Sequence, residues 1–130
     1  MRKTYDFLKK AGTFYLATIE NNEPRVRPFG AVSMYNNKLY ICTSNKKDCF
    51  KQMMQNGRVE ISAMVGAEWI RVSAKVVEDP SVEAKKAMLS ENPVLNGLYS
   101  LNDGIFEVLY LEKAAASFYQ FGKDKTVETF

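Results

Sequence analysis

Hydrophobic and polar residues alternate along most of this chain with the two-residue period of a β-strand. Runs of this kind are rich in β-branched and aromatic residues and end at polar or glycine-containing turns. They predict strands at 13–19, 25–34, 38–43, 58–65, 69–77, 104–111 and 115–121. Asn36 and Asn37 have the composition of a two-residue hairpin turn between the second and third runs. We therefore expect the first three strands to be consecutive and antiparallel.

Apolar residues follow helical spacing in three shorter segments. These segments span residues 4–11, 48–55 and about 80–90. Gly12 suits the C-terminal end of the first helix. Asp79 and Pro80 predict the start of the third helix, because an N-cap residue is often followed by proline at the first helical position. Strands outnumber helices, so the pattern predicts a mainly β protein, a small antiparallel barrel with helices covering its openings.

Composition adds that the chain is one ordinary domain, spanning residues 1–130. Hydrophobic residues make up 46% of the chain and charged residues 25%, and no internal repeat interrupts the pattern. The longest uncharged apolar stretch, 11–19, is far too short to cross a bilayer. The first residues also lack the pattern of a secretory signal. We expect a cytoplasmic protein with no membrane segment.

Charge and cysteine content narrow the classes of function. The net charge of +3 is mild and spread along the chain, so we expect no nucleic-acid surface, and a local anion site suits it better. Cys42 and Cys49 flank a predicted strand-to-helix junction and form no Cys-x-x-Cys pair, which predicts two reduced, mostly buried thiols.

Histidine is absent from the chain. Its absence excludes Ser-His and Cys-His nucleophilic catalysis and histidine acid–base chemistry, and it removes the usual ligand of zinc and haem sites. We therefore expect no metal site and identify no catalytic side chain. If the chain catalyses a reaction, a cofactor should carry the chemistry.

Two lysines stand where the second helix should begin. With Asn45 or Ser44 as the N-cap, Lys46 and Lys47 fall in the first turn, and with Asn45 as the cap Asp48 takes the third helical position, as in a capping box. A cation at a helix N-terminus is unfavourable by about 0.3 kcal/mol or more, whereas a phosphate is stabilised there. The two lysines are therefore either simply solvated, in a chain with 18 Lys and Arg residues, or part of an anion site.

The second predicted strand contains an unusual Arg-Pro-Phe-Gly segment. Pro28 cannot donate a ladder hydrogen bond and Gly30 has no side chain, so the segment marks an edge, a bulge or a place where a ligand lies against the backbone. Arg25 and Arg27 share one face by strand alternation. Two like charges beside Pro28, Phe29 and Gly30 again indicate an anion, here next to a flat apolar group.

Together these segments resemble the pyridoxamine 5'-phosphate oxidase-like family of FMN-binding split barrels. The resemblance is carried, in order, by residues 25–30, 39–48, 56–61 and 69–72, and it extends from about Phe14 to Phe121. It implies an antiparallel split β-barrel of Greek-key type that binds FMN. It also implies a homodimer with the cofactor site at the subunit interface.

The resemblance assigns the phosphate end of the cofactor to two segments. Arg27 and Lys47 look like the residues that hold the FMN phosphate, with Thr43, Ser44 and Lys46 around it. Charge-assisted hydrogen bonds of this kind are worth about 1.5–3 kcal/mol each.

The flavin ring is assigned to other residues. By the same resemblance, Pro28, Phe29 and Gly30 would lie along the isoalloxazine ring, and Trp69 and Tyr119 would reach a flavin bound mainly by the other subunit. From the residues alone, Trp69 and Tyr119 are more typical of ordinary core positions than of stacking partners.

We therefore expect a small FMN-binding oxidoreductase of unknown substrate. A quinone, a nitro compound or another flavin are candidate acceptors, with NAD(P)H as donor. One alternative is a non-catalytic module that binds or senses flavin, and another is a split barrel that uses a deazaflavin or other phosphorylated cofactor. Members that oxidise pyridoxamine phosphate hold the substrate phosphate through an Arg and a His, so the absence of histidine speaks against that activity here.

Overall fold

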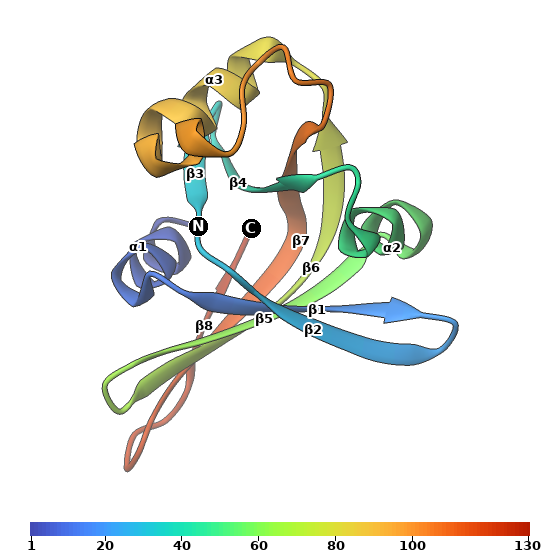
Figure 1. Cartoon of the computed structure of the whole chain (residues 1–130). Helices are drawn as coiled ribbons and strands as arrows, with labels where there is room; N and C mark the ends of the chain where they lie inside the picture. The colour runs from blue at the N-terminus through green and yellow to red at the C-terminus, as the bar shows by residue number, and fades with distance from the viewer.

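The alternating pattern folds into one antiparallel sheet of eight strands in a computed structural model that describes residues 1–130 (Figure 1). The strands are β1 Phe14–Glu20, β2 Glu23–Phe29, β3 Val32–Tyr35, β4 Lys38–Ser44, β5 Arg58–Val65, β6 Glu68–Asp79, β7 Phe106–Gln120 and β8 Thr126–Thr129. Their order in the sheet is β2-β1-β5-β6-β7-β4-β3, and β8 pairs with β7. The mainly β fold class is therefore confirmed.

The sheet curves strongly but does not close by hydrogen bonds. Its two ends are β2 and β3, which follow each other in the chain without pairing. Figure 1 shows β1 and β2 crossing below while β3 and β4 rise to the other half of the sheet. This opening between the sheet ends is what makes the barrel split.

Three α-helices and one 3₁₀-helix complete the fold. They are α1 Arg2–Ala11, α2 Asp48–Asn56, α3 Val82–Glu91 and the 3₁₀-helix η1 Pro93–Gly97. α1 packs against β3 and β5, α2 against β1, and α3 against β3 and β7. None of these helices is long and apolar enough to span a bilayer.

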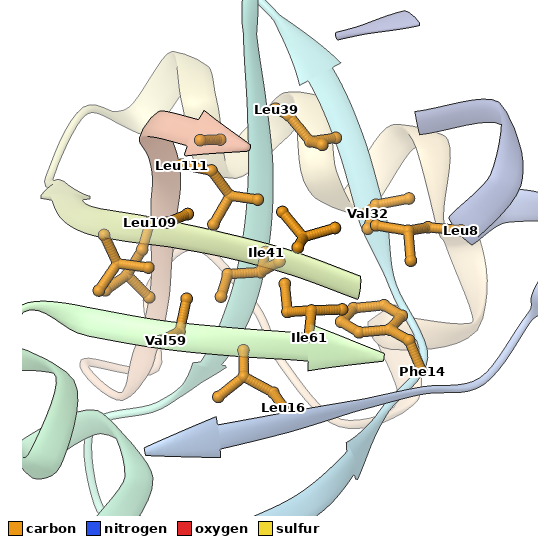
Figure 2. Close-up of a cluster of buried hydrophobic side chains, with 14 of the residues drawn as sticks. Leu8, Phe14, Leu16, Val32, Leu39, Ile41, Val59, Ile61, Leu109 and Leu111 are labelled. Carbon is orange, nitrogen blue, oxygen red and sulfur yellow. The ribbon is translucent and has the colours of Figure 1, made fainter. Parts of the chain in front are cut away.

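Two apolar clusters form the core, and β4 contributes to both. Leu39 and Ile41 point into the larger cluster, which Figure 2 shows between the strands and α1. Tyr40 and Cys42 point the other way, into a smaller cluster beneath α3. Because both faces of β4 are buried, the position of its C-terminal end, where α2 begins, is fixed.

The strand predicted at 25–34 is wrong, because the chain forms two strands there. β2 ends at Phe29, which pairs with Phe14 of β1, and β3 starts at Val32, which pairs with Ile41 of β4. Gly30 and Ala31 make the crossing between these two partners. The proline and glycine that interrupt the alternation therefore mark the point where the chain leaves one edge of the sheet for the other.

The sequence pattern also misses the extent of the last strands. Residues 104–111 and 115–121 were predicted as two strands, but they belong to the single strand β7. Lys113 has a positive φ of 49°, yet the strand continues through it because the long β6 pairs with β7 on both sides of this residue. β8 escapes prediction because it is short and largely polar, with the sequence Thr-Val-Glu-Thr.

The predicted cap of the third helix is wrong by two residues. Ser81 is the N-cap, and its hydroxyl accepts a hydrogen bond of 3.2 Å from the amide of Ala84. Asp79 instead ends β6, and its carboxylate accepts a hydrogen bond from the amide of Ser81.

Candidate functional site

The start of α2 differs from the prediction. Lys47 is the N-cap residue and the helix begins at Asp48, so the lysines lie just before the first turn rather than in it. Asn45 is held elsewhere, since its amide donates to the carbonyl of Ile105 at 2.8 Å. No side chain caps α2. The amide of Phe50 donates to the carbonyl of Lys47 at 3.2 Å, and the amides of Asp48 and Cys49 remain a potential anion-binding element beside Lys47.

A cleft of about 250 Å³ opens in front of this helix start. Three parts of the chain form it: the end of β2, the junction of β4 with α2, and η1 with the residues that follow it. Its lining residues are Arg27, Pro28, Phe29, Gly30, Ala31, Cys42, Thr43, Lys47, Cys49, Val94, Leu95, Leu98 and Tyr99. Six of the ten residues predicted from the sequence, Arg27, Pro28, Phe29, Gly30, Thr43 and Lys47, are thus brought together here.

Arg27 is half-buried and firmly held in this cleft. Its Nη1 atom donates to the hydroxyl of Thr18 on β1 at 2.7 Å, and its Nη2 atom donates to the side chain of Gln52 on α2 at 2.8 Å. Arg25, predicted to share its face, does not line the cleft and pairs with Glu23 at 2.9 Å. Only one of the two arginines is therefore available to a ligand there.

Gln52 is a site-supporting residue that the sequence analysis missed. It is buried, and its amide nitrogen donates to Glu20 at 3.2 Å while its oxygen accepts from Arg27. The sequence feature that could have indicated it is a polar residue between Phe50 and Met53, on the side of the amphipathic helix that faces the core.

The thiols of the cleft wall are free and buried, as predicted. Burial raises the pKa of Cys42 to about 12, although the nearby charge of Lys47 opposes this shift. Cys49 lies 3.4 Å from the hydroxyl oxygen of Thr43. The Cys42 thiol therefore stays protonated at neutral pH and is a poor nucleophile.

The third side of the cleft was not predicted. Val94, Leu95, Leu98 and Tyr99 come from η1 and the two residues after it. The aromatic ring of Tyr99 packs against Phe106 with a centroid distance of 4.8 Å. Burial raises the pKa of Tyr99, so its hydroxyl is neutral at neutral pH. The available signal was the apolar content of 93–99 after the predicted end of a helix.

The four remaining predicted residues lie outside the cleft. Ser44 is buried and its hydroxyl accepts a hydrogen bond from the amide of Lys46, whose own side chain is exposed. Trp69 and Tyr119 line a separate groove of about 380 Å³ between α1 and the hairpins β5–β6 and β7–β8. Their rings stack on each other with centroids 4.0 Å apart and an angle of 12°. Within one chain, this aromatic pair does not meet Arg27 or Lys47.

The charged side chains that line the cleft are all positive. Arg27 and Lys47 are its two cationic side chains, and none of the lining residues is acidic. No group of three or more His, Cys, Asp or Glu side chains lies close enough to hold a metal ion. The cleft can therefore bind an anion at Arg27 and Lys47 and an apolar group along the rest of its wall.

Comparisons with known proteins identify the family. The profile described as pyridoxamine 5'-phosphate oxidase matches residues 2–96. A NimC/NimA family protein from Clostridium acetobutylicum has the same fold with a TM-score of 0.98 and 46% sequence identity, covering 100% of this chain and 92% of that one. Curated protein sequences yield no match.

More distant solved structures show the fold alone. A protein of the pyridoxinephosphate oxidase family from the same organism, related to general stress protein 26, has a TM-score of 0.72 and 11% identity, covering 99% of this chain and 93% of that one. A heme binding protein from Mycobacterium smegmatis has a TM-score of 0.72 and 14% identity, covering 94% of this chain and 57% of that one. On the profile match and the 46% identical structure, the chain belongs to the pyridoxamine 5'-phosphate oxidase-like family.

Proposed function

We propose that this protein is an FMN-binding oxidoreductase that transfers a hydride or electrons to a small acceptor, with NAD(P)H as donor. The observation that carries the proposal is the cleft itself. It places Arg27 and Lys47 beside the uncapped N-terminus of α2 and next to the Pro28–Gly30 backbone. A phosphorylated flat ring is the ligand that uses all three features.

The cationic end of the cleft suits a phosphate. Arg27 is oriented by two hydrogen bonds to the protein, so little side-chain entropy would be lost when it binds an anion. Lys47 is exposed and free to turn toward the same point. Charge-assisted hydrogen bonds from these two residues would contribute about 1.5–3 kcal/mol each, and the helix amides would add to them.

The wall formed by Pro28, Phe29 and Gly30 suits the edge and face of a planar ring. Gly30 is exposed, and its surroundings leave its backbone open, since a Cβ atom there would meet only the carbonyl of Gly12 at 3.8 Å. A bound flavin supplies the two-electron chemistry itself. In this proposal the protein holds the ring and limits the access of water. Neutral side chains suit such a site, and Cys42 and Tyr99 both remain protonated at neutral pH because burial raises their pKa values.

A homodimer with the cofactor at the subunit interface is part of the proposal. The cleft measures about 250 Å³, less than the 300–1,000 Å³ typical of small-molecule sites, so one chain covers only part of such a ligand. Strand register places Trp69 and Tyr119 on the outer face of the sheet that also carries the exposed Tyr15, Val26 and Met64. Exposed apolar faces of this kind mark interfaces. In the proposed dimer, this face lets Trp69 and Tyr119 of one subunit approach the cleft of the other.

Spectroscopy of the freshly purified protein tests the proposal. A bound yellow chromophore released as FMN, and bleached within seconds by NADH or NADPH without oxygen, supports the oxidoreductase. Bound FMN that neither nicotinamide reduces would favour the non-catalytic flavin module. Release of a deazaflavin or another phosphorylated compound would assign a different cofactor, and a colourless protein that does not bind added FMN would exclude both flavin functions.

A further inference from the structure

The cleft has an apolar rim that the proposed phosphate and ring contacts do not use. We define this rim as Val94, Leu98 and Tyr99. Val94 is 82% exposed and Leu98 71%, so neither side chain contributes much to the core, whereas Leu95 is buried and anchors η1. Covering exposed apolar surface stabilises a complex because water is released from it. The rim can therefore bind an apolar molecule without a change in the packing of the core.

Tyr99 adds one hydrogen-bond donor to this rim. Packing against Phe106 fixes its ring, and burial raises its pKa, with no hydrogen bond among the causes of the shift. A neutral phenol without a protein partner can donate its proton to an acceptor atom of a ligand. The rim thus combines two apolar side chains with a single O–H group.

The charge distribution restricts what the rim can bind. Arg27 and Lys47 are the two cations that line the cleft, and both bind the cofactor phosphate in the proposed function. A second phosphate or a carboxylate would find no free cation at the rim. A cationic ligand would find no carboxylate in the cleft. A neutral molecule avoids both of these desolvation costs.

We propose that the apolar rim is the acceptor subsite of the enzyme and that it takes a neutral planar quinone. The quinone ring packs on the exposed side chains of Val94 and Leu98, outside the part of the cleft that the cofactor fills, and one carbonyl oxygen accepts a hydrogen bond from the hydroxyl of Tyr99. A quinone matches the rim because its polar atoms are acceptors only and its ring faces are apolar. This inference rests on the proposed function and assigns Leu98 and Tyr99 as specificity-determining residues for it.

Two probes and three variants test the subsite. The probes are duroquinone, a neutral and fully methylated benzoquinone that cannot add thiols, and anthraquinone sulfonate, a planar quinone with a negative charge. Binding of each to the FMN-loaded protein is measured by calorimetry, and their reduction is measured separately. Leu98→Asn should weaken duroquinone binding about tenfold, as expected for a lost leucine contact. Tyr99→Phe should weaken it about threefold, as expected for one neutral hydrogen bond.

The matched control is Leu101→Asn. Leu101 lies on the same connection but lines a different hollow of the surface, so this variant should bind duroquinone like the parent protein. FMN affinity is titrated in each variant and should fall less than duroquinone affinity does in Leu98→Asn and Tyr99→Phe. In the steady state, Leu98→Asn should raise KM for duroquinone more than it lowers kcat.

Failure of the subsite and failure of the proposed function give different results. The subsite is overturned if the FMN-loaded protein does not bind duroquinone, binds it equally well in all variants, or prefers the sulfonate. If the purified protein binds no FMN, the same titration is made on it directly. Duroquinone binding that still depends on Leu98 then supports the subsite while the flavin proposal fails, and binding that does not depend on Leu98 overturns both.

Discussion

Arg27 and Gln52 are joined by a hydrogen bond of 2.8 Å, from Nη2 of the guanidinium to Oε1 of the amide. The same amide oxygen also accepts the hydroxyl proton of Thr18, so one buried glutamine orients two donors of the candidate site. Because Gln52 lies on α2 and Arg27 on β2, this contact links the helix that follows Lys47 to the strand that contains the arginine. Loss of the amide should therefore disturb both binding and folding.

Gln52→Leu should lower FMN affinity by about tenfold and destabilise the protein by about 1–3 kcal/mol. The leucine fits the buried position but leaves the donors of Arg27 and Thr18 without their acceptor. Urea unfolding and FMN titration measure the two effects. Gln55→Leu is the control, because Gln55 is exposed on the same helix. Equal FMN affinity in parent and Gln52→Leu proteins would show that Arg27 does not depend on this contact.

Replacing Arg27 and Lys47 together with alanine should weaken FMN binding by at least about a hundredfold, with the fold retained. Each residue is expected to provide a charge-assisted hydrogen bond worth about 1.5–3 kcal/mol to the phosphate. Fluorescence titration with FMN gives the affinity, and circular dichroism reports the fold. An unchanged titration would place the phosphate elsewhere.

The double variant Arg25→Ala with Lys46→Ala is the matched control. These residues lie close to Arg27 and Lys47 in sequence and carry the same charges, but neither lines the cleft. The control removes the same net charge from the protein and should leave FMN affinity within about twofold of the parent. A loss as large as that of the first pair would mean that the effect comes from overall charge and not from a local site.

Much of the site was predictable because its residues interrupt a regular pattern. Pro28 and Gly30 break an alternating strand, and Lys47 stands at a strand-to-helix junction, so each is visible without knowledge of the fold. These interruptions line one cleft because the sheet curves, so that β2 at one end comes near β4, the strand next to the other end. That juxtaposition depends on long-range strand order, which local periodicity does not encode.

The parts that escaped prediction share one physical feature: tertiary contacts override local preference. Asn45 is a favourable N-cap by type, but its backbone amide donates to the carbonyl of Ile105 and its side-chain amide to that of Gly104. The helix therefore starts later, with the less favourable Lys47 as its N-cap. Gln52 is polar by type yet buried, because its partners come from β1 and β2. Tyr99 lies in an apolar segment with no strand or helix periodicity, and it lines the cleft after η1, which Leu95 anchors in the core. Each of these depends on residues distant in sequence.

Trp69→Ala should lower FMN affinity and change the fluorescence of bound flavin, with dimer formation weakened. In the proposed dimer, Trp69 stacked on Tyr119 reaches the cleft of the other subunit, so its loss removes both an aromatic contact and interface area. Size-exclusion chromatography with light scattering gives the subunit count, and flavin fluorescence gives the second readout. Val82→Ala serves as control, since Val82 is half exposed on α3, which is not part of this face of the sheet. A monomeric parent protein that binds FMN tightly would contradict this arrangement.

Glu128 should make the stability of the fold depend on pH. Its carboxylate lies on β8 and accepts hydrogen bonds from the amide and the hydroxyl of Thr4, at 2.9 and 2.6 Å, and it pairs with the α-amino group of Met1 at 2.7 Å. Burial alone would raise the pKa of Glu128, but the hydrogen bonds from the amino group and Thr4 outweigh burial and lower the pKa to about 2. The clamp therefore joins α1 to the last strand only while the carboxylate is charged.

The sign of the pH effect follows from this lowered pKa. Because the carboxyl group of Glu128 ordinarily titrates near 4.5 and in the folded chain near 2, its stabilisation is complete above about pH 4.5 and is lost as the pH falls toward 2. Glu128→Gln should thus destabilise the protein by about 1–3 kcal/mol at neutral pH and lose less stability than the parent on acidification. Urea unfolding between about pH 7 and pH 3 measures both, with Glu23→Gln as the exposed-pair control, expected to cost less than about 1 kcal/mol. If the free energy of unfolding of the parent and of Glu128→Gln changed with pH in parallel, the charged carboxylate of Glu128 would not be what holds α1.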